Sequence, residues 1–186
     1  MAEGWEEIAK FGKKVVSSGL TSSRFGNISL LKGRRILVTC TGTMLDELDA
    51  GQIVEVDLQG QCASEERASI ETCVHRAIYR RTSAVAVIHT HSPFAVALSL
   101  LEEGSVEPLD SEGAAFLGMI PIVEGPSGSE DLAEAVSLAL KSHRACIARG
   151  HGVFAAGEGL LQAYDAACMA EHSSMVRYLV RAQSRL

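Results

Sequence analysis

Two histidines separated by one residue follow an apolar run, with His89 and His91 coming directly after Ala84–Ile88. The length of this run and its valine and isoleucine content indicate a buried strand. Side chains two residues apart on a strand point to the same face, so the two imidazoles should lie side by side at its end. Neutral imidazole is a good ligand for Zn²⁺, so the pair predicts half of a metal site. Simple hydrogen bonding of both rings to nearby carbonyls is the alternative, and the pair alone does not decide between the two.

Two further residues have the chemistry to complete such a site. His151 lies between two glycines, where neighbouring groups can approach it closely. Glu71 falls in the first turn of a helix expected over residues 69–81, with Ser69 as the expected N-cap. The helix dipole favours a carboxylate there, so the alternative is that Glu71 only complements this dipole. The strand bearing the paired histidines follows this helix directly. The other histidines lack a companion at ligand spacing and are interpreted as structural or surface residues: His75, His143 and His172.

Small residues form two loops beside an expected hairpin. Gly26-Asn27 precedes its first strand, and Thr41-Gly42 follows its second. An antiparallel hairpin brings both loops to one end, where small residues let backbone amides approach an anion. Ordinary turn chemistry is the alternative, and these residues alone favour it.

Periodicity predicts a chain in which helices and strands alternate loosely. Helices are expected over residues 4–18, 69–81, 93–101, 129–140 and 160–186. Strands are expected at 28–31, 36–39, 53–57, 84–88, 120–123 and 145–148, with 153–156 continuing the last. This order favours an α/β or α+β fold with a mixed sheet. A length of 186 residues is most simply one domain, residues 1–186.

Composition narrows the classes of partner and location. The net charge is −6, with 47% hydrophobic and 22% charged residues, which is typical of a globular protein. We expect no nucleic-acid partner, because phosphate binding needs a basic patch. We expect no membrane partner and a cytoplasmic location, because no apolar run approaches ~18 residues and no signal-peptide pattern is present. An odd number of widely spaced cysteines predicts neither disulfides nor a thiolate zinc site: Cys40, Cys62, Cys73, Cys146 and Cys168.

Taken together, five short motifs resemble those of the class II aldolase/epimerase family, and within it most of all the aldolases that cleave L-fuculose 1-phosphate. The motifs are Gly26-Asn27-Ile28-Ser29, Thr41-Gly42, Ser69-Ile70-Glu71, His89-Thr90-His91 and Gly150-His151-Gly152. The resemblance covers nearly the whole chain. It implies a three-layer α/β/α sandwich around a mixed, mostly antiparallel sheet. It also implies a homotetramer with active sites at subunit interfaces and a Zn²⁺ or other divalent transition-metal ion.

The resemblance also assigns roles by position. His89, His91 and His151 match the histidine ligands, and Glu71 matches the glutamate that binds the metal and acts as acid/base. The residues that match the phosphate pocket are Gly26, Asn27, Thr41, Gly42 and Ser69. The implied reaction is retro-aldol cleavage of a phosphorylated ketose to dihydroxyacetone phosphate and an aldehyde such as lactaldehyde, through a zinc-stabilised enediolate.

Some positions depart from the aldolase pattern. Ile70 stands where these aldolases carry a second serine, which removes one phosphate ligand. Asp110, Ser111 and Glu112 lie near the place of a tyrosine that a neighbouring subunit contributes. The tail after Glu171 is short, so a C-terminal tyrosine of the aldolases has no obvious counterpart.

These departures keep other activities of the family open. Asp110 is more typical of ribulose-phosphate 4-epimerases, although those enzymes usually carry aspartate at the position of Glu71. A dehydratase acting on a thio-sugar phosphate is a further variant. A non-catalytic scaffold is disfavoured, because all three histidines and the glutamate are present.

Overall fold

The computed structural model describes residues 4–60 and 66–183 and is built on an eight-stranded sheet of order β3-β2-β1-β4-β8-β7-β6-β5. The strands are β1 (Asn27–Lys32), β2 (Arg35–Thr39), β3 (Ile53–Asp57), β4 (Ala86–Thr90), β5 (Ser105–Val106), β6 (Ile120–Val123), β7 (Ala145–Ala148) and β8 (Gly152–Gly157). The α-helices are α1 (Trp5–Ser17), α2 (Thr72–Arg81), α3 (Pro93–Ser99), α4 (Ser111–Phe116), α5 (Glu130–Ala139) and α6 (Leu160–Gln183). Two short 3₁₀ helices, η1 (Leu45–Glu47) and η2 (Ala50–Gln52), precede β3.

Antiparallel pairing dominates this sheet, and only β6 and β7 run parallel among the described strands. The predicted hairpin is confirmed, with Ser29 of β1 opposite Val38 of β2. In the centre of the sheet, His89 of β4 lies opposite Asn27 of β1 on one side and Phe154 of β8 on the other. The register therefore brings two predicted site residues to the same level.

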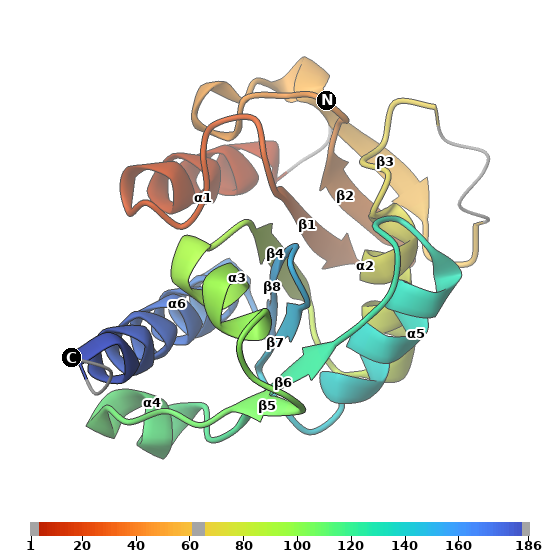
Figure 1. Ribbon diagram of the computed structural model, residues 1–186. Helices are drawn as coiled ribbons and strands as arrows, with labels where there is room; N and C mark the ends of the chain where they lie inside the picture. Colours follow the sequence, from red (N-terminus) through yellow and green to blue (C-terminus); the bar gives the residue numbers. More distant parts are fainter. Residues whose placement is uncertain (1–3, 61–65, 184–186) are drawn as a thin grey trace.

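Helices cover both faces of the sheet (Figure 1). One core packs α1, α3 and α6 against the sheet, and the other packs α2 and α5 against its opposite face. Strand β4 divides its residues between the two cores, with Ala86 and Ile88 in the first and Val87 in the second. This alternation follows from the period of two along a strand, and it directs His89 toward the face covered by α2. The predicted three-layer architecture is confirmed.

Two local expectations from the sequence are wrong. Residues 145–156 do not form one continuous strand, because Gly150 adopts φ +67° and lets the chain reverse, pairing Ala148 with Gly152. The helix expected from Ser69 begins only at Thr72, with the backbone of Glu71 at its N-cap position. The amide of Ser69 instead donates to the Thr39 carbonyl (3.1 Å), which ties this segment to the end of β2.

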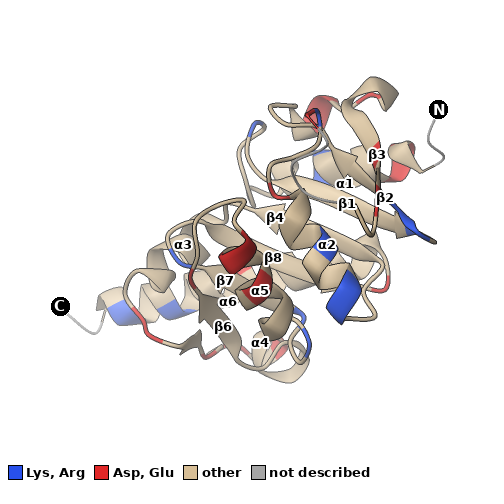
Figure 2. Ribbon diagram, turned by 90° about the vertical axis from the view of Figure 1, so that its right-hand side faces the viewer, with Lys and Arg blue, Asp and Glu red and all other residues tan. Residues whose placement is uncertain are grey.

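Neither the charged residues nor the cysteines of the described chain gather on a single helix or strand. Basic residues occupy the last turn of α2 and acidic residues the first turn of α5, and Figure 2 shows both signs interspersed along the ribbon. Cysteines 40, 73, 146 and 168 are free thiols, and Cys62 lies outside the described residues. Among the described residues, no helix is long and apolar enough to span a membrane.

Candidate metal centre and substrate pocket

Three histidines from two parts of the chain meet at one end of the sheet. His89 is the fourth residue of β4, His91 follows that strand, and His151 lies in the turn between β7 and β8. Their ring centroids are separated by 5.0 Å (His89–His91), 4.7 Å (His89–His151) and 4.9 Å (His91–His151). One ring nitrogen from each lies within 4.8 Å of the others. The structure therefore brings together the three predicted imidazoles as a group that could bind a metal ion.

The surroundings of His89 fix the orientation of its ring. Its Nδ1 lies 3.0 Å from the Val153 carbonyl and donates to it, and Phe154 stacks on the ring at 4.1 Å. Burial lowers the pKa of His89 to about 3, so the ring is neutral near pH 7. Its Nε2 lone pair is then buried without a hydrogen bond, 3.1 Å from Oε2 of Glu71. A lone pair facing a carboxylate is unfavourable unless a cation joins them, so this donor set fits a metal ion.

Glu71 is buried, and each of its oxygens has both an imidazole and a neutral donor nearby. Asn27 Nδ2 donates to Oε2 (3.1 Å), and Ser127 Oγ donates to Oε1 (3.0 Å). His151 Nε2 lies 3.6 Å from Oε1. Burial by itself raises the pKa of Glu71, but the histidines and these hydrogen bonds outweigh it and lower the pKa overall. The side chain is therefore an ionised carboxylate near pH 7, beside two of the three clustered imidazoles.

A pocket of about 180 Å³ opens beside this carboxylate. All five residues predicted for phosphate binding line it: Gly26, Asn27, Thr41, Gly42 and Ser69. Glu71, His91 and His151 also line it. Gly26 has φ +86°, and a side chain there would overlap the carbonyl oxygen of His89, so only glycine fits. The two loops expected at one end of the hairpin therefore meet at the clustered histidines.

Several lining residues were not predicted from the sequence. Ser127 comes from the loop before α5 and contacts Glu71, 56 positions earlier in the sequence. No local pattern predicts a contact between residues this far apart in the chain. Phe25 stacks on His91 at 5.3 Å, and the side chain of Arg24 brings a cation to the exposed edge. Residue 70, the departure from the serine of the aldolases, lines the pocket as an exposed isoleucine.

The acidic segment at residues 110–112 does not line this pocket in the described chain. Asp110 begins α4, and its Oδ2 accepts a hydrogen bond from the Gly113 amide (2.8 Å). This hydrogen bond makes Asp110 the N-cap of a helix that the sequence analysis did not predict.

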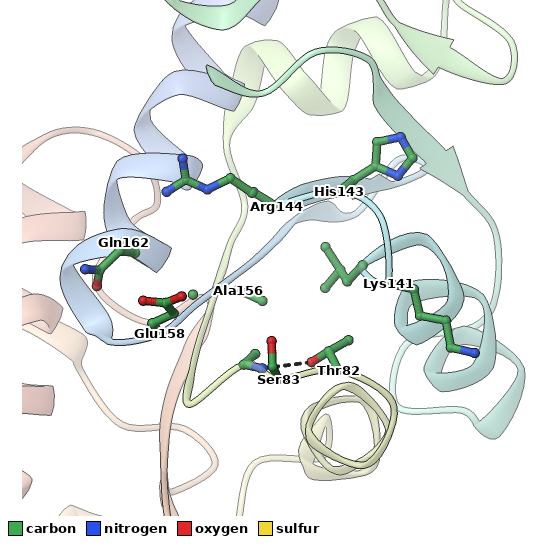
Figure 3. A pocket seen from close by; sticks show the side chains of 11 residues that line it. Thr82, Ser83, Lys141, His143, Arg144, Ala156, Glu158 and Gln162 are labelled. Atoms are coloured by element: carbon green, nitrogen blue, oxygen red, sulfur yellow. Dashed lines mark hydrogen bonds between the residues drawn. The ribbon is translucent and has the colours of Figure 1, made fainter. Parts of the chain in front are cut away.

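A second pocket, of about 440 Å³, lies at the opposite end of the sheet (Figure 3). It is bounded by the start of β4 and the end of β8, whereas the histidines stand at the end of β4 and the start of β8. Its charged side chains, Lys141, Arg144 and Glu158, are exposed, and no residue predicted for the site lines it. The clustered imidazoles and the buried carboxylate therefore belong to the smaller pocket.

Comparison with known proteins decides the family. Residues 6–178 match the model of the class II aldolase and adducin N-terminal domain. The chain belongs to this family. A class II aldolase homologue from Methanocaldococcus jannaschii, named L-fuculose phosphate aldolase, is 36% identical over 82% of the chain and 80% of its own length. The crystal structure of L-fuculose-1-phosphate aldolase from Thermus thermophilus superposes with a TM-score of 0.91 at 36% identity, covering 97% of this chain and 95% of that one.

Class II aldolase relatives also include a differently named enzyme. The 3-oxo-tetronate 4-phosphate decarboxylase of Pectobacterium atrosepticum is 31% identical over 86% of the chain and 76% of its own length. The resemblance found in the sequence and the prediction of a class II aldolase-type enzyme are confirmed at the level of the family.

Proposed function

We propose that the chain is a metal-dependent aldolase that cleaves a phosphorylated ketose resembling L-fuculose 1-phosphate. The products would be dihydroxyacetone phosphate and an aldehyde such as lactaldehyde. The observation that carries this proposal is the position of Glu71. Its ionised carboxylate lies beside two of three clustered imidazoles, and it lines the same pocket as the small-residue loops. This juxtaposition supports the proposal that an acid/base group, a metal-ligand set and an anion pocket act together.

The metal would be held by His89, His91 and His151, with Glu71 as the fourth ligand and Zn²⁺ or another divalent transition ion as the fitting occupant. When bound, it would supply Lewis-acid stabilisation of the negative charge that develops on the substrate oxygens. Glu71 would move a proton to or from the carbon next to the carbonyl, as an acid/base of this geometry can.

The phosphate would lie among Gly26, Asn27, Thr41, Gly42 and Ser69. Small residues leave backbone amides open to its oxygens, and the side chain of Arg24 lines the same pocket as a cation. Ile70 provides no hydroxyl there, so we expect fewer hydrogen bonds to the phosphate than a serine would allow.

The test is a panel of phosphorylated ketoses incubated with metal-loaded protein. The proposal predicts free dihydroxyacetone phosphate from a ketose 1-phosphate, detected by a coupled reduction. Formation of a ketose phosphate with one stereocentre inverted, without free dihydroxyacetone phosphate, would instead identify an epimerase. Release of carbon dioxide from an oxo-acid phosphate would identify a decarboxylase like the Pectobacterium relative.

We further propose that residues 1–186 form one domain and that the enzyme is cytoplasmic. We also propose that the chain assembles as a homotetramer with its active sites at subunit interfaces. Two exposed apolar side chains at the pocket support the assembly, because Phe25 is 56% and Ile70 66% exposed in one chain. A second copy that covers them would remove this apolar area from water. Light scattering of the protein as it leaves a gel-filtration column should give a mass of about four chains.

A further inference from the structure

His151 differs from His89 in how its ring is held. The Nδ1 of His89 donates to the Val153 carbonyl (3.0 Å), so a hydrogen bond sets the orientation of that ring. The Nδ1 of His151 is also buried, but within the described chain no side chain or backbone group forms a hydrogen bond with it. Histidines that bind a metal usually hold their second nitrogen in such a hydrogen bond. The place of the His151 imidazole must therefore be set mainly by its backbone.

The backbone of His151 forms a tight turn between β7 and β8. Gly150 adopts φ +67°, and the His151 amide donates to the Ala148 carbonyl (3.0 Å). The Gly150 amide donates to Oγ of Ser99, the last residue of α3 (2.9 Å). Ser99 is fully buried, so the hydroxyl lies in the interior of the protein. The β7–β8 turn is thus attached to the C-terminal end of α3.

The Arg149 side chain attaches the same turn a second time. Its guanidinium donates to the Ser99 carbonyl and to the Glu102 carbonyl (3.1 Å), which lie at the end of α3 and just beyond it. It also donates to the carboxylates of Glu103 (2.8 Å) and Glu124 (2.6 Å). Those two carboxylate side chains are 91% and 70% exposed, and exposed ion pairs contribute little. The two carbonyls at the end of α3 therefore provide most of the attachment.

The other end of α3 is tied to the second clustered imidazole. His91 lies two residues before Pro93, where α3 begins. The carboxylate of Glu171 accepts hydrogen bonds from the Phe94 amide (3.0 Å) and the Ala95 amide (2.9 Å), which holds this end against α6. A helix has a fixed rise per residue, so α3 sets the spacing between the segment of His91 and the β7–β8 turn.

We propose that Arg149 is a positioning residue, which sets the place of His151 as a metal ligand by fixing the β7–β8 turn to α3. The inference rests on the proposed function, because it takes His151 to be a ligand. Replacing a residue with a merely structural role would lower the melting temperature and leave the metal affinity of the folded protein unchanged. Replacing Arg149 should weaken metal binding in protein that is fully folded.

The experiment compares Arg149→Met with wild type by calorimetric titration of metal-free protein with Zn²⁺, after circular dichroism has confirmed folding. Methionine keeps an apolar stem and removes every hydrogen bond of the guanidinium. The dissociation constant for Zn²⁺ should rise by about tenfold, the lower end of the effect seen for groups that orient a ligand. Arg149→Lys keeps the charge but loses the planar fork of donors, so it should raise the dissociation constant by about threefold.

Arg177→Met is the matched control. The Arg177 guanidinium also binds the chain that follows α3, donating to the Glu102 carboxylate (2.7 Å) and the Glu107 carbonyl (3.2 Å), and neither contact involves the β7–β8 turn. This variant should lower the melting temperature and leave the dissociation constant for Zn²⁺ within about twofold of wild type.

Wild-type zinc affinity in folded Arg149→Met would overturn the inference, and Arg149→Lys decides in the same way if the methionine variant does not fold. An equal loss of affinity in Arg177→Met would overturn it too. Wild-type protein that binds no Zn²⁺ would overturn the proposed metal site and this inference with it. Zinc binding that depends on Arg149, in a protein that cleaves no ketose phosphate, would support the inference and remove only the proposed reaction.

Discussion

The pocket at the histidine end of the sheet encloses about 180 Å³, less than half the roughly 440 Å³ of the pocket at the opposite end. The smaller pocket contains Glu71 and Asn27, both buried, and adjoins the fully buried ring of His89. The larger pocket has charged groups only at exposed positions, such as Lys141 and Arg144. Burial of polar groups carries a cost that must be offset, whereas exposed charges interact weakly through water. Buried polar groups that face one another therefore distinguish the two pockets better than their volumes do.

The conservative change Glu71→Gln, at the histidine end of the sheet, should have the largest effect on activity. It keeps the size of the side chain but removes the negative charge and the ability to accept a proton. We expect the rate of cleavage to fall by at least ~10²-fold, the usual contribution of a positioned acid/base, while the metal stays bound. Dihydroxyacetone phosphate release, normalised to metal content by elemental analysis, measures this. Near-normal turnover with metal present would remove Glu71 from the mechanism.

His75 should also make the free energy of unfolding depend on pH. This ring is fully buried next to the turn of Glu71, its Nδ1 lies 2.6 Å from Ser29 Oγ, and burial lowers its pKa to about 4. The folded pKa lies below the unfolded value of about 6.5, so the native state binds fewer protons between these values. The contribution of His75 to the free energy of unfolding should therefore be most favourable above pH 6.5 and fall by about 3 kcal/mol as the pH drops toward 4.

Urea unfolding of metal-free protein at several pH values measures this dependence. His75→Gln removes one titrating ring, so it should lower the slope of the free energy of unfolding against pH between 4 and 6.5, while His89 keeps its own share of that slope. An identical slope in wild type and variant would show that His75 does not titrate in this window.

The smallest effect is expected at the opposite end of the sheet. Lys141→Ala and Arg144→Ala remove exposed charges far from the histidines, so each should change the free energy of unfolding by no more than about 0.5 kcal/mol. Cleavage should stay within about twofold of wild type. A large loss of turnover in either variant would mean that the larger pocket takes part in the reaction.

Local patterns predicted the parts of the fold that depend on neighbours in sequence. The hairpin and the helix after Ser129 follow from alternation, helical period and capping, and the structure contains them. The strand expected before His89 is present as β4, and it continues through His89 to Thr90. The break between β7 and β8 was missed because a glycine permits either a continued strand or a reversal. The start of α2 was misplaced because Ser69 pairs with Thr39, a contact set by the sheet and not by the helix signal.

The same distinction holds for the site. The paired histidines can be recognised from their spacing on a strand. His151 and Glu71 are candidates from their local sequence, and their roles as ligands were assigned by resemblance to a family. Ser127 contacts Glu71 across 56 positions and Asn27 contacts it across 44, and no periodicity within either segment encodes these contacts. They depend on how β1 and the loop before α5 pack around the start of α2, which only the folded chain reveals.

Three imidazoles from two parts of the chain are proposed to share one divalent ion, and the metal content of the protein measures whether they do. Wild-type protein and His151→Ala should be loaded with Zn²⁺, dialysed extensively and measured by elemental analysis alongside circular dichroism to confirm folding. We expect about one ion per chain in wild type and far below one in the variant, because the variant loses one of the three clustered imidazoles. A folded His151→Ala protein that still retains about one zinc per chain would show that His151 does not hold the ion.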